Sequence, residues 1–320
     1  MKFKNIYTFL NKDLDLIEKE LALTVQSDYP MLSEAGLDML QAGGKRIRPV
    51  FVLLSGMFGD YSIDRIKHTA VALEIIHMAT LVHDDVIDDA ELRRGRPTVK
   101  SRWDNRIAMY TGDYLFAKSL ELMTMLEDPL AHKILSKTIV DVVIGEIEQL
   151  KDKYRYEQSL KDYLKRIKRK TAILIATSCQ LGAISAGVSP ELHKKLYQYG
   201  YNVGMSFQII DDILDFTSSE KELGKPVGSD LLQGNITLPV LIAMEDPSLR
   251  NQIIKVGPDT KPEEINPLIE HILKSGAIEK SYEVSNRYLS KAFDLLNELP
   301  SNKARSTLHS IAKYIGKRKI

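Results

Sequence analysis

Apolar residues recur every three or four positions along most of the chain, which is the spacing of one face of an α-helix. The first segment shows this pattern from Ile6 to Leu21. A second helix is predicted around Pro30–Leu40 and a third from Pro49 to Met57. A long helix is predicted from Ile63 to Asp89, a stretch without Gly or Pro. Further helices are predicted near 108–126, 130–155, 159–187, 190–215, 237–245, 262–275, 276–297 and 302–317.

Strand signals are nearly absent from the sequence. No two-residue alternation is sustained, and no Asn-Gly or Asp-Gly hairpin turn occurs. Glycine and proline gather at the joints between the predicted helices, as in Gly43-Gly44 and Gly95-Arg96-Pro97. No repeat of solenoid length and no linker-like shift in composition is present. The pattern predicts an all-α fold, with one domain over residues 1–320 built as a single large helical bundle.

Composition and charge narrow the possible functions. The chain is 44% hydrophobic and 27% charged, so it can form a sizeable core. Its formal net charge is +1, which argues against nucleic acid as the principal partner. The single cysteine, Cys179, excludes an internal disulfide and a CxxC-type zinc site. The longest uncharged stretch, 171–190, is too polar to span a membrane, and we expect a soluble, cytoplasmic protein.

Two acidic runs share the spacing D-D-x-x-D. Residues four apart lie over one another on a helix, so Asp84 stacks on Asp88 and Asp211 on Asp215. Like charges stacked in this way repel and need a counter-charge. Hard oxygen ligands suit Mg²⁺, which commonly bridges carboxylates and substrate phosphates. The alternative is that acidic residues only solubilise the ends of two helices. The carboxylates of the two runs are Asp84, Asp85, Asp88, Asp89, Asp211, Asp212 and Asp215.

The helix face that carries the first run has a polar end and an apolar end. Thr80 lies one turn and His77 two turns before Asp84, on the same face of the helix. Ile76 and Leu73 continue the helix as an apolar wall. This arrangement fits a ligand with a charged head and a hydrophobic tail.

Several short basic clusters could hold phosphate. Each of them, taken singly, is more often a solvated loop or helix face. Together with two sets of carboxylates they indicate a polyphosphate ligand, because arginine binds phosphate bidentately and lysine acts as a point charge. The clusters are Gly43-Gly44-Lys45-Arg46-Ile47-Arg48-Pro49, Arg93-Arg94-Gly95-Arg96-Pro97, Lys170-Thr171 and Gly224-Lys225-Pro226.

These residues resemble the trans-isoprenyl (polyprenyl) diphosphate synthase family, and the resemblance extends from end to end of the chain. It implies a helical bundle of the isoprenoid synthase type with a central cavity. The motifs that carry it are GGKRIRP (43–49), HDDVIDDAELRRGRP (83–97), GEIEQ (145–149), KT (170–171), FQIIDDILD (207–215), GKPVGSDL (224–231) and TLP (237–239).

The resemblance implies a role for each matched residue. Asp84, Asp88 and Asp211 would bind Mg²⁺, which bridges the allylic diphosphate, with Asp85, Asp212 and Asp215 in support. The diphosphate of isopentenyl diphosphate would be held by Lys45, Arg48, His77 and Arg94. The allylic diphosphate would be contacted by Arg93, Lys170, Thr171, Gln208 and Lys225. The chain departs from the family pattern at Asn235, where many members have Lys.

The expected reaction is head-to-tail condensation of isopentenyl diphosphate onto an allylic diphosphate, with farnesyl diphosphate as the expected starter. Thr80 and Ala79, four and five positions before the first aspartate, are both small. Short-chain relatives have a bulky aromatic in this region, so its absence predicts a long all-trans product, of heptaprenyl length. A shorter, geranylgeranyl product is the alternative.

Two other readings remain open. A class I terpene cyclase also uses acidic helices and Mg²⁺, but it needs no GGKRIRP element. A non-catalytic subunit of a heteromeric synthase would be expected to lose motif aspartates, and all of them are present here. Partners are expected to be a small regulatory subunit or a second copy of the chain, and the amphipathic product suggests transient membrane contact.

Overall fold

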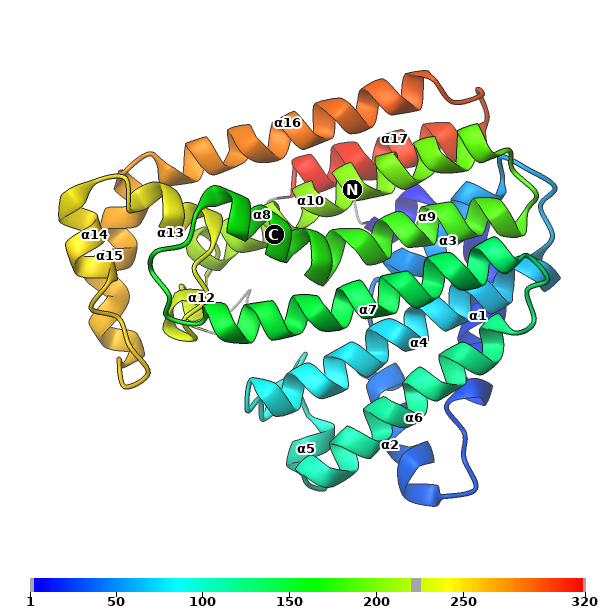
Figure 1. Ribbon diagram of the computed structural model, residues 1–320, viewed down its shortest axis with the longest axis horizontal. Helices are drawn as coiled ribbons and strands as arrows, with labels where there is room; N and C mark the ends of the chain where they lie inside the picture. Colours follow the sequence, from blue (N-terminus) through cyan, green and yellow to red (C-terminus); the bar gives the residue numbers. More distant parts are fainter. Residues whose placement is uncertain (1–2, 220–225, 319–320) are drawn as a thin grey trace. The chain divides into compact units, whose positions relative to one another are not determined.

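The computed structural model describes residues 3–219 and 226–318 (Figure 1). Its elements, in chain order, are η1 (Phe3–Ile6), η2 (Thr8–Leu10), α1 (Asn11–Thr24), α2 (Pro30–Gln41), α3 (Ile47–Gly56), α4 (Ile63–Ile87), β1 (Leu92–Arg93), β2 (Arg96–Pro97), α5 (Val99–Arg102), α6 (Asn105–Met123), α7 (Pro129–Asp152), α8 (Leu160–Ile167), the π-helical turn η3 (Lys168–Ala172), α9 (Ile173–Ser185), α10 (Pro190–Thr217), α12 (Ser229–Leu232), α13 (Leu238–Ala243), α14 (Pro247–Ile253), α15 (Pro262–Lys274), α16 (Ala277–Asn297) and α17 (Lys303–Gly316).

The prediction of an all-α fold is confirmed, and most predicted helices begin and end within a few residues of the observed ones. Two local predictions were wrong. The first helix begins at Asn11 instead of Ile6, because the residues before it form two 3-10 turns. The helix predicted over 159–187 is divided into α8 and α9 by the π-helical turn at Lys168–Ala172.

The hairpin of β1 and β2 was not predicted. Leu92 pairs with Pro97, and Arg93 pairs with Arg96. The two turn residues, Arg94 and Gly95, both have positive φ, which a two-residue type I′ turn requires. Arginine is an uncommon residue in that conformation, so the sequence carries no Asn-Gly or Asp-Gly signal for the turn.

Contacts between Cα atoms divide the chain into two compact units. The first contains Met1–Ile139, Thr177–Tyr197 and Leu299–Leu308, and the second contains Val140–Ala176, Gln198–Glu298 and His309–Ile320. The prediction of one domain with a central cavity concerns both units together and stays a prediction.

In the first unit, α4 is the central helix. It packs against α6, α3 and α1, and Figure 1 shows α4 and α6 side by side. Gly112 on α6 permits this close approach, because a Cβ there would lie 2.2 Å from Nε2 of His83 on α4. Along α4 the apolar side chains of Ile66, Leu73 and Ile76 are fully buried. The helix that carries the first acidic run is therefore held rigidly by its neighbours.

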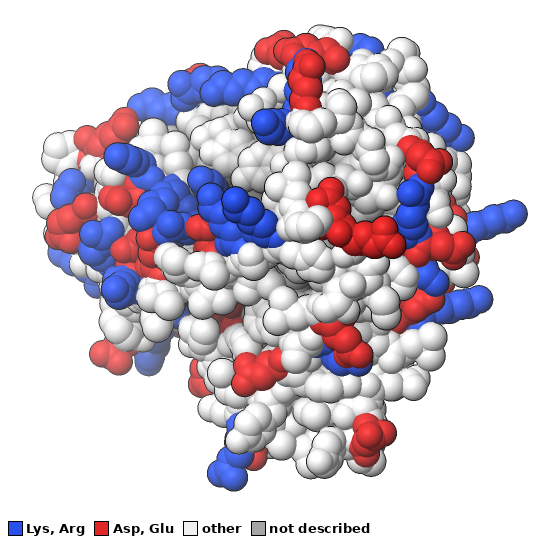
Figure 2. Space-filling view, turned by 45° about the vertical axis from the view of Figure 1, so that its right-hand side comes forward, with Lys and Arg blue, Asp and Glu red and all other residues white. Residues whose placement is uncertain are grey.

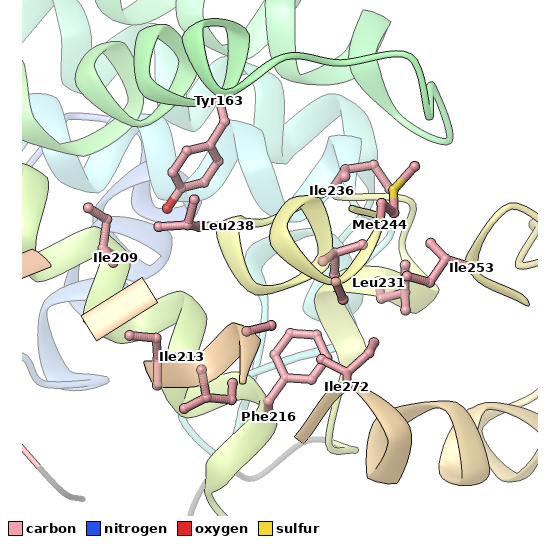
Figure 3. Packing of buried hydrophobic residues seen from close by; sticks show 14 of the residues in the cluster. Tyr163, Ile209, Ile213, Phe216, Leu231, Ile236, Leu238, Met244, Ile253 and Ile272 are labelled. Atoms are coloured by element: carbon pink, nitrogen blue, oxygen red, sulfur yellow. The ribbon is translucent and has the colours of Figure 1, made fainter. Parts of the chain in front are cut away.

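The second unit has its own hydrophobic core. Figure 3 shows part of it: Ile213 and Phe216 on α10 face Leu231 and Ile272 from later helices. α13 packs against α16, and α14 packs against α15. Because α10 contributes side chains to this core along its last three turns, the second acidic run at its end is also fixed in place.

Side chains of both signs are spread over the face drawn in Figure 2, as the near-zero net charge leads one to expect. Cys179 is buried, and burial raises the pKa of its thiol to about 12, so at neutral pH it is an unreactive thiol. Among the helices of residues 3–219 and 226–318, none combines the length and apolar character needed to cross a membrane.

Candidate active site

Both acidic runs lie at the C-terminal end of a long helix. α4 ends at Ile87 with Asp88 as its C-cap, and Asp211 and Asp215 lie in the last two turns of α10. The unpaired carbonyls of a helix C-terminus carry partial negative charge. Carboxylates at this end are therefore destabilised unless a cation is near. The position of the two runs favours cation binding, which the sequence predicted from their spacing alone.

In the first run, Asp85 is paired with Arg93 of the hairpin. Nε and Nη2 of Arg93 donate to Oδ1 of Asp85 at 2.8 and 2.7 Å. The other oxygen, Oδ2, is buried and has no hydrogen-bond partner. Burial raises the pKa of the Asp85 carboxyl, and Arg93 opposes the shift. Arg93 lies four residues after Asp89, a spacing that would pair the two on a continuous helix. α4 ends at Ile87, however, and the hairpin brings Arg93 next to Asp85 instead.

The remaining carboxylates of this run differ in exposure. Asp84 and Asp88 are partly exposed, and they are separated by the last turn of α4, which ends at Ile87 with Asp88 as its C-cap. Asp89 lies outside the helix with a positive φ and is paired with the buried ammonium of Lys100, which also contacts Glu91 at 3.4 Å. The half-exposed pair Asp84 and Asp88 therefore remains the part of this run best placed to meet a ligand.

Three predicted ligands of isopentenyl diphosphate come together in the first unit. Arg48, His77 and Arg94 influence one another electrostatically around the buried carboxylate of Glu74. Burial lowers the pKa of Arg48 to about 10, and the nearby charge of Glu74 partly offsets this shift. Nε of Arg48 has no hydrogen-bond partner. Burial and the surrounding arginines hold the pKa of His77 well below its usual value, so its imidazole is neutral at pH 7. Lys45, the fourth predicted ligand, is exposed.

Arg46, the neighbour of the predicted ligands, has a structural role. It pairs with Glu18 and, at 3.3 Å, with Glu74, and it donates to the carbonyl of Leu40 at 3.1 Å. Burial lowers its pKa, but these two carboxylates outweigh the burial and raise it. Gly44 leaves room for this arrangement, since a Cβ there would lie 3.1 Å from a guanidinium nitrogen of both Arg46 and Arg94.

The second acidic run is built into the second unit. Asp211 is paired with Arg318 near the C-terminus, whose guanidinium also lies over the ring of Phe207 at 5.2 Å. Asp215 is buried and accepts from the Ser229 hydroxyl and the Asp230 backbone N–H, each at 3.1 Å. Asp215 therefore fixes the start of α12, and Asp211 is the carboxylate of the run that pairs with a cation from the C-terminal segment.

Asp212 is the buried member of the second run. Its oxygens accept from the hydroxyl of Tyr163 at 2.7 Å and from the Gln208 amide at 2.8 Å. Burial, with Asp230 and Asp211 nearby, raises the pKa of Asp212 to about 7, while the two hydrogen bonds lower it.

The Lys-Thr pair lies within the π-helical turn that the sequence did not predict. Such turns widen a helix and are frequent at functional sites. Lys170 donates to Oε1 of Gln149 at 2.7 Å, and the Thr171 hydroxyl donates to Oε1 of Gln208 at 2.6 Å. Gln149 is the last residue of the GEIEQ motif, whose role the sequence left open. It orients the lysine.

These residues line a cavity of about 120 Å³ within the second unit. Lys170, Gln208 and Asp212 contribute to its wall, as does Asn235, the departure from the family pattern. The buried guanidinium of Arg166 also lines it and holds the backbone carbonyl of Ile236. A cation therefore stands beside Asn235, although it comes from α8.

The two predicted chain-length residues differ in their environment. Ala79 is fully buried within the first unit, and Thr80 is partly exposed and donates its hydroxyl to the carbonyl of His77 at 2.8 Å. Lys225 lies outside the described residues. Three residues of these two sites were not predicted: Glu74, Tyr163 and Arg166. Glu74 had a signal, because it is a carboxylate on a stretch of helix that is otherwise apolar.

The donor set fits a divalent cation bound together with a ligand. No group of three or more His, Cys, Asp or Glu side chains in the described chain is arranged as a complete metal site. Mg²⁺ keeps several waters and is usually held by one or two carboxylates with substrate phosphates. The partly exposed Asp84 and Asp88 at a helix C-terminus, beside the unpartnered Oδ2 of Asp85, match that mode of binding.

Known proteins resemble this chain over its whole length. It is 68% identical to heptaprenyl diphosphate synthase component 2 of Bacillus subtilis (strain 168), a match that covers 100% of this chain and 92% of the relative. It is 62% identical to the protein of the same name from Geobacillus stearothermophilus, with 99% of each chain covered.

Solved structures give the same result. Heptaprenyl diphosphate synthase from Staphylococcus aureus has a TM-score of 0.94 and 45% identity, and the match covers 97% of this chain and 99% of that one. Polyprenyl synthase from Caulobacter crescentus CB15, complexed with calcium and isoprenyl diphosphate, has a TM-score of 0.93 and 30% identity, with 100% and 98% covered. The polyprenyl synthetase family model matches residues 29–272. With its acidic runs, its basic clusters and these relatives in agreement, the chain belongs to the polyprenyl synthetase family and is a prenyltransferase.

Proposed function

We propose that the chain is the catalytic subunit of a two-component heptaprenyl diphosphate synthase. It condenses isopentenyl diphosphate units onto farnesyl diphosphate, and the product serves menaquinone side-chain synthesis. The observation that carries the proposal is the full-length similarity to two proteins named component 2, at 68% and 62% identity, in a chain that keeps every motif aspartate. Residues 1–320 act as one functional domain, because the similarity to these two relatives covers 100% and 99% of the chain.

In the first unit, Arg48, Arg94 and His77 bind the diphosphate of isopentenyl diphosphate. The unpartnered Nε of Arg48 supplies a charge-assisted hydrogen bond, which is about twice as strong as a neutral one. Neutral His77 supplies one ring N–H and adds no charge. Exposed Lys45 contributes a fourth cationic contact from the loop before α3.

Lys170, Thr171 and Gln208, all in the second unit, bind the allylic diphosphate, and the motif resemblance adds Arg93 and Lys225 as further contacts. Asp84, Asp88 and Asp211 hold Mg²⁺. When bound, the metal neutralises charge on the departing diphosphate. The proteins in the Caulobacter and Corynebacterium glutamicum structures are complexed with calcium and isoprenyl diphosphate, which supports the use of a divalent cation by this chain.

The reaction balances without a covalent enzyme intermediate. The C–O bond to the allylic diphosphate breaks, and the double bond of isopentenyl diphosphate forms a new C–C bond at the carbon released. The resulting cation loses one proton, which the departing diphosphate accepts, and the product is an allylic diphosphate one unit longer. The enzyme's own contribution is to hold both diphosphates in place and to exclude water from the cation.

The proposed partner is a smaller subunit, and the supporting observation is the name component 2 carried by both bacterial relatives. A homodimer is the alternative assembly. We propose that the complex works in the cytoplasm and touches the membrane only to release its amphipathic product.

The test is mass analysis of products from the purified chain with farnesyl diphosphate, isopentenyl diphosphate and Mg²⁺, without and with a candidate small subunit. A heptaprenyl product that needs both proteins is expected. A long product from this chain alone would refute the two-component assignment. Absence of any product with both proteins, under conditions where a known synthase is active, would refute the proposed activity.

A further inference from the structure

A buried tyrosine stands behind the second acidic run. Tyr163 on α8 is fully buried, and its hydroxyl donates to Oδ2 of Asp212 at 2.7 Å. The other oxygen of Asp212 accepts from Nε2 of Gln208 at 2.8 Å. Both carboxylate oxygens are thus engaged inside the protein. The orientation of Asp212 is therefore fixed by two hydrogen bonds, and Tyr163 donates one of them.

The hydrogen bonds continue from Asp212 to the Lys-Thr pair. Nε2 of Gln208 faces the carboxylate, so Oε1 of its amide faces away and accepts from the Thr171 hydroxyl at 2.6 Å. An amide has its acceptor on one side only, and the anchor on Asp212 decides which side that is. The donors of Tyr163 and Gln208 thus converge on the two oxygens of Asp212, and Thr171 donates to Gln208 one step further out.

Within the described residues, the hydroxyl of Tyr163 has one hydrogen-bond partner, the carboxylate of Asp212. Figure 3 shows the ring extending from α8, with its oxygen directed toward Ile209 and Leu238. Phenylalanine would fill this apolar space equally well, and a buried hydroxyl is retained only where it finds a partner. The guanidinium of Arg166 lies 5.7 Å from the ring and holds the backbone at Ile236. α8 is therefore tied to the backbone at Ile236 one turn after the tyrosine.

We propose that Tyr163 is a positioning residue for the allylic diphosphate. Its hydroxyl orients Asp212, which orients Gln208 and through it Thr171 beside Lys170. This inference rests on the proposed function, since Gln208 and Thr171 are the residues assigned there to the allylic diphosphate. Without the hydroxyl, one oxygen of a buried carboxylate loses its donor, and the amide of Gln208 is free to turn.

The experiment compares Tyr163→Phe with Tyr156→Phe as a matched control. Tyr156 packs against the same hydrophobic core and its hydroxyl also donates one hydrogen bond, at 2.5 Å, but to the backbone carbonyl of Val256. Binding of an unreactive allylic thiodiphosphate and of isopentenyl diphosphate is measured by calorimetry with Mg²⁺. Kinetics with the small subunit then give KM and kcat for each substrate.

We expect Y163F to weaken allylic thiodiphosphate binding about 5- to 30-fold, and to change isopentenyl diphosphate binding less than 2-fold. Y156F should change neither, although both variants lose a similar amount of thermal stability. In the background of Gln208→Leu, the effect of Y163F on allylic binding should shrink to less than 2-fold, because both residues act along one chain.

Equal binding by Y163F and the wild type would overturn the proposal for Tyr163 while leaving the proposed function intact. The same holds if Y163F weakens both substrates equally, or if its effect is undiminished in the Q208L background. A wild-type protein that binds no allylic thiodiphosphate would instead overturn the proposed function, and this proposal with it.

Discussion

Two neighbouring arginines of the GGKRIRP motif should respond to the same substitution with opposite sign. Arg48 is partly buried, its Nε is buried without a hydrogen-bond partner, and burial lowers its pKa from 12.5 to about 10. That difference corresponds to about 3 kcal/mol against the charged side chain in the folded protein. Replacing Arg48 with a neutral side chain recovers part of this free energy, and the loss of packing around the shorter side chain offsets another part. We expect Arg48→Gln to stabilise the ligand-free protein by about 1 to 2 kcal/mol.

Arg46 should behave in the opposite way. It pairs with Glu18 and Glu74, and Glu74 is only 3% exposed. Arg46→Gln removes the ion pairs to both carboxylates and should cost about 2 to 3 kcal/mol, less than a fully buried pair because Glu18 is partly exposed and Arg48 and Arg94 still lie near Glu74. The two variants thus distinguish a cation kept for a ligand from a cation kept for the fold.

The assay is thermal unfolding with and without inorganic pyrophosphate. At about 2 °C per kcal/mol for a chain of this size, R48Q should melt about 2 to 4 °C above the wild type, and R46Q about 4 to 6 °C below it. Pyrophosphate at about 100 times its Kd should raise the wild-type Tm by about 5 °C, since that occupancy is worth about 2.7 kcal/mol. R48Q should lose most of this rise. An R48Q protein that melts below the wild type, or that keeps the full response to pyrophosphate, would refute the reasoning.

Three further outcomes are expected. Ala79→Phe should shorten the product, because a bulky ring at this fully buried position displaces its neighbours and leaves less depth for a growing tail, and mass analysis showing an unchanged product would contradict this. The wild-type protein should lose stability as the pH falls from 7 to 5, because His77 binds a proton in the unfolded chain but not in the folded protein. His77→Gln should make this loss smaller, and urea unfolding midpoints across that pH range test it. Arg318→Gln should tighten Mg²⁺ binding about 3- to 10-fold in calorimetry by releasing Asp211, whereas Lys313→Gln should not.

The helices show how far a linear pattern can be taken. α4 and α10 were predicted to within two residues at most ends, because helical periodicity is a local property that the buried face of each helix retains in the folded protein. The π-helical turn at Lys168–Ala172 and the β1–β2 hairpin were missed. Both depend on backbone conformations that their residues, Lys170 and Arg94 among them, do not favour by themselves.

The candidate site divides in the same way. The spacing of the two aspartate runs placed Asp84 over Asp88 and Asp211 over Asp215, because i and i+4 coincide on any α-helix. Motif resemblance named Arg48, but no linear pattern distinguishes it from Arg46. Their opposite environments arise from Glu18 and Glu74, which come from other helices.

By itself, the sequence determined the all-α class, the helix faces, the acidic runs and the family, since each is encoded in residues close together along the chain. Only the tertiary structure decided which charges are paired. Arg93 meets Asp85 instead of Asp89, Arg318 meets Asp211, and Tyr163 meets Asp212 across 49 residues. Such pairings depend on distances in space between side chains of different helices, and packing of the cores sets those distances.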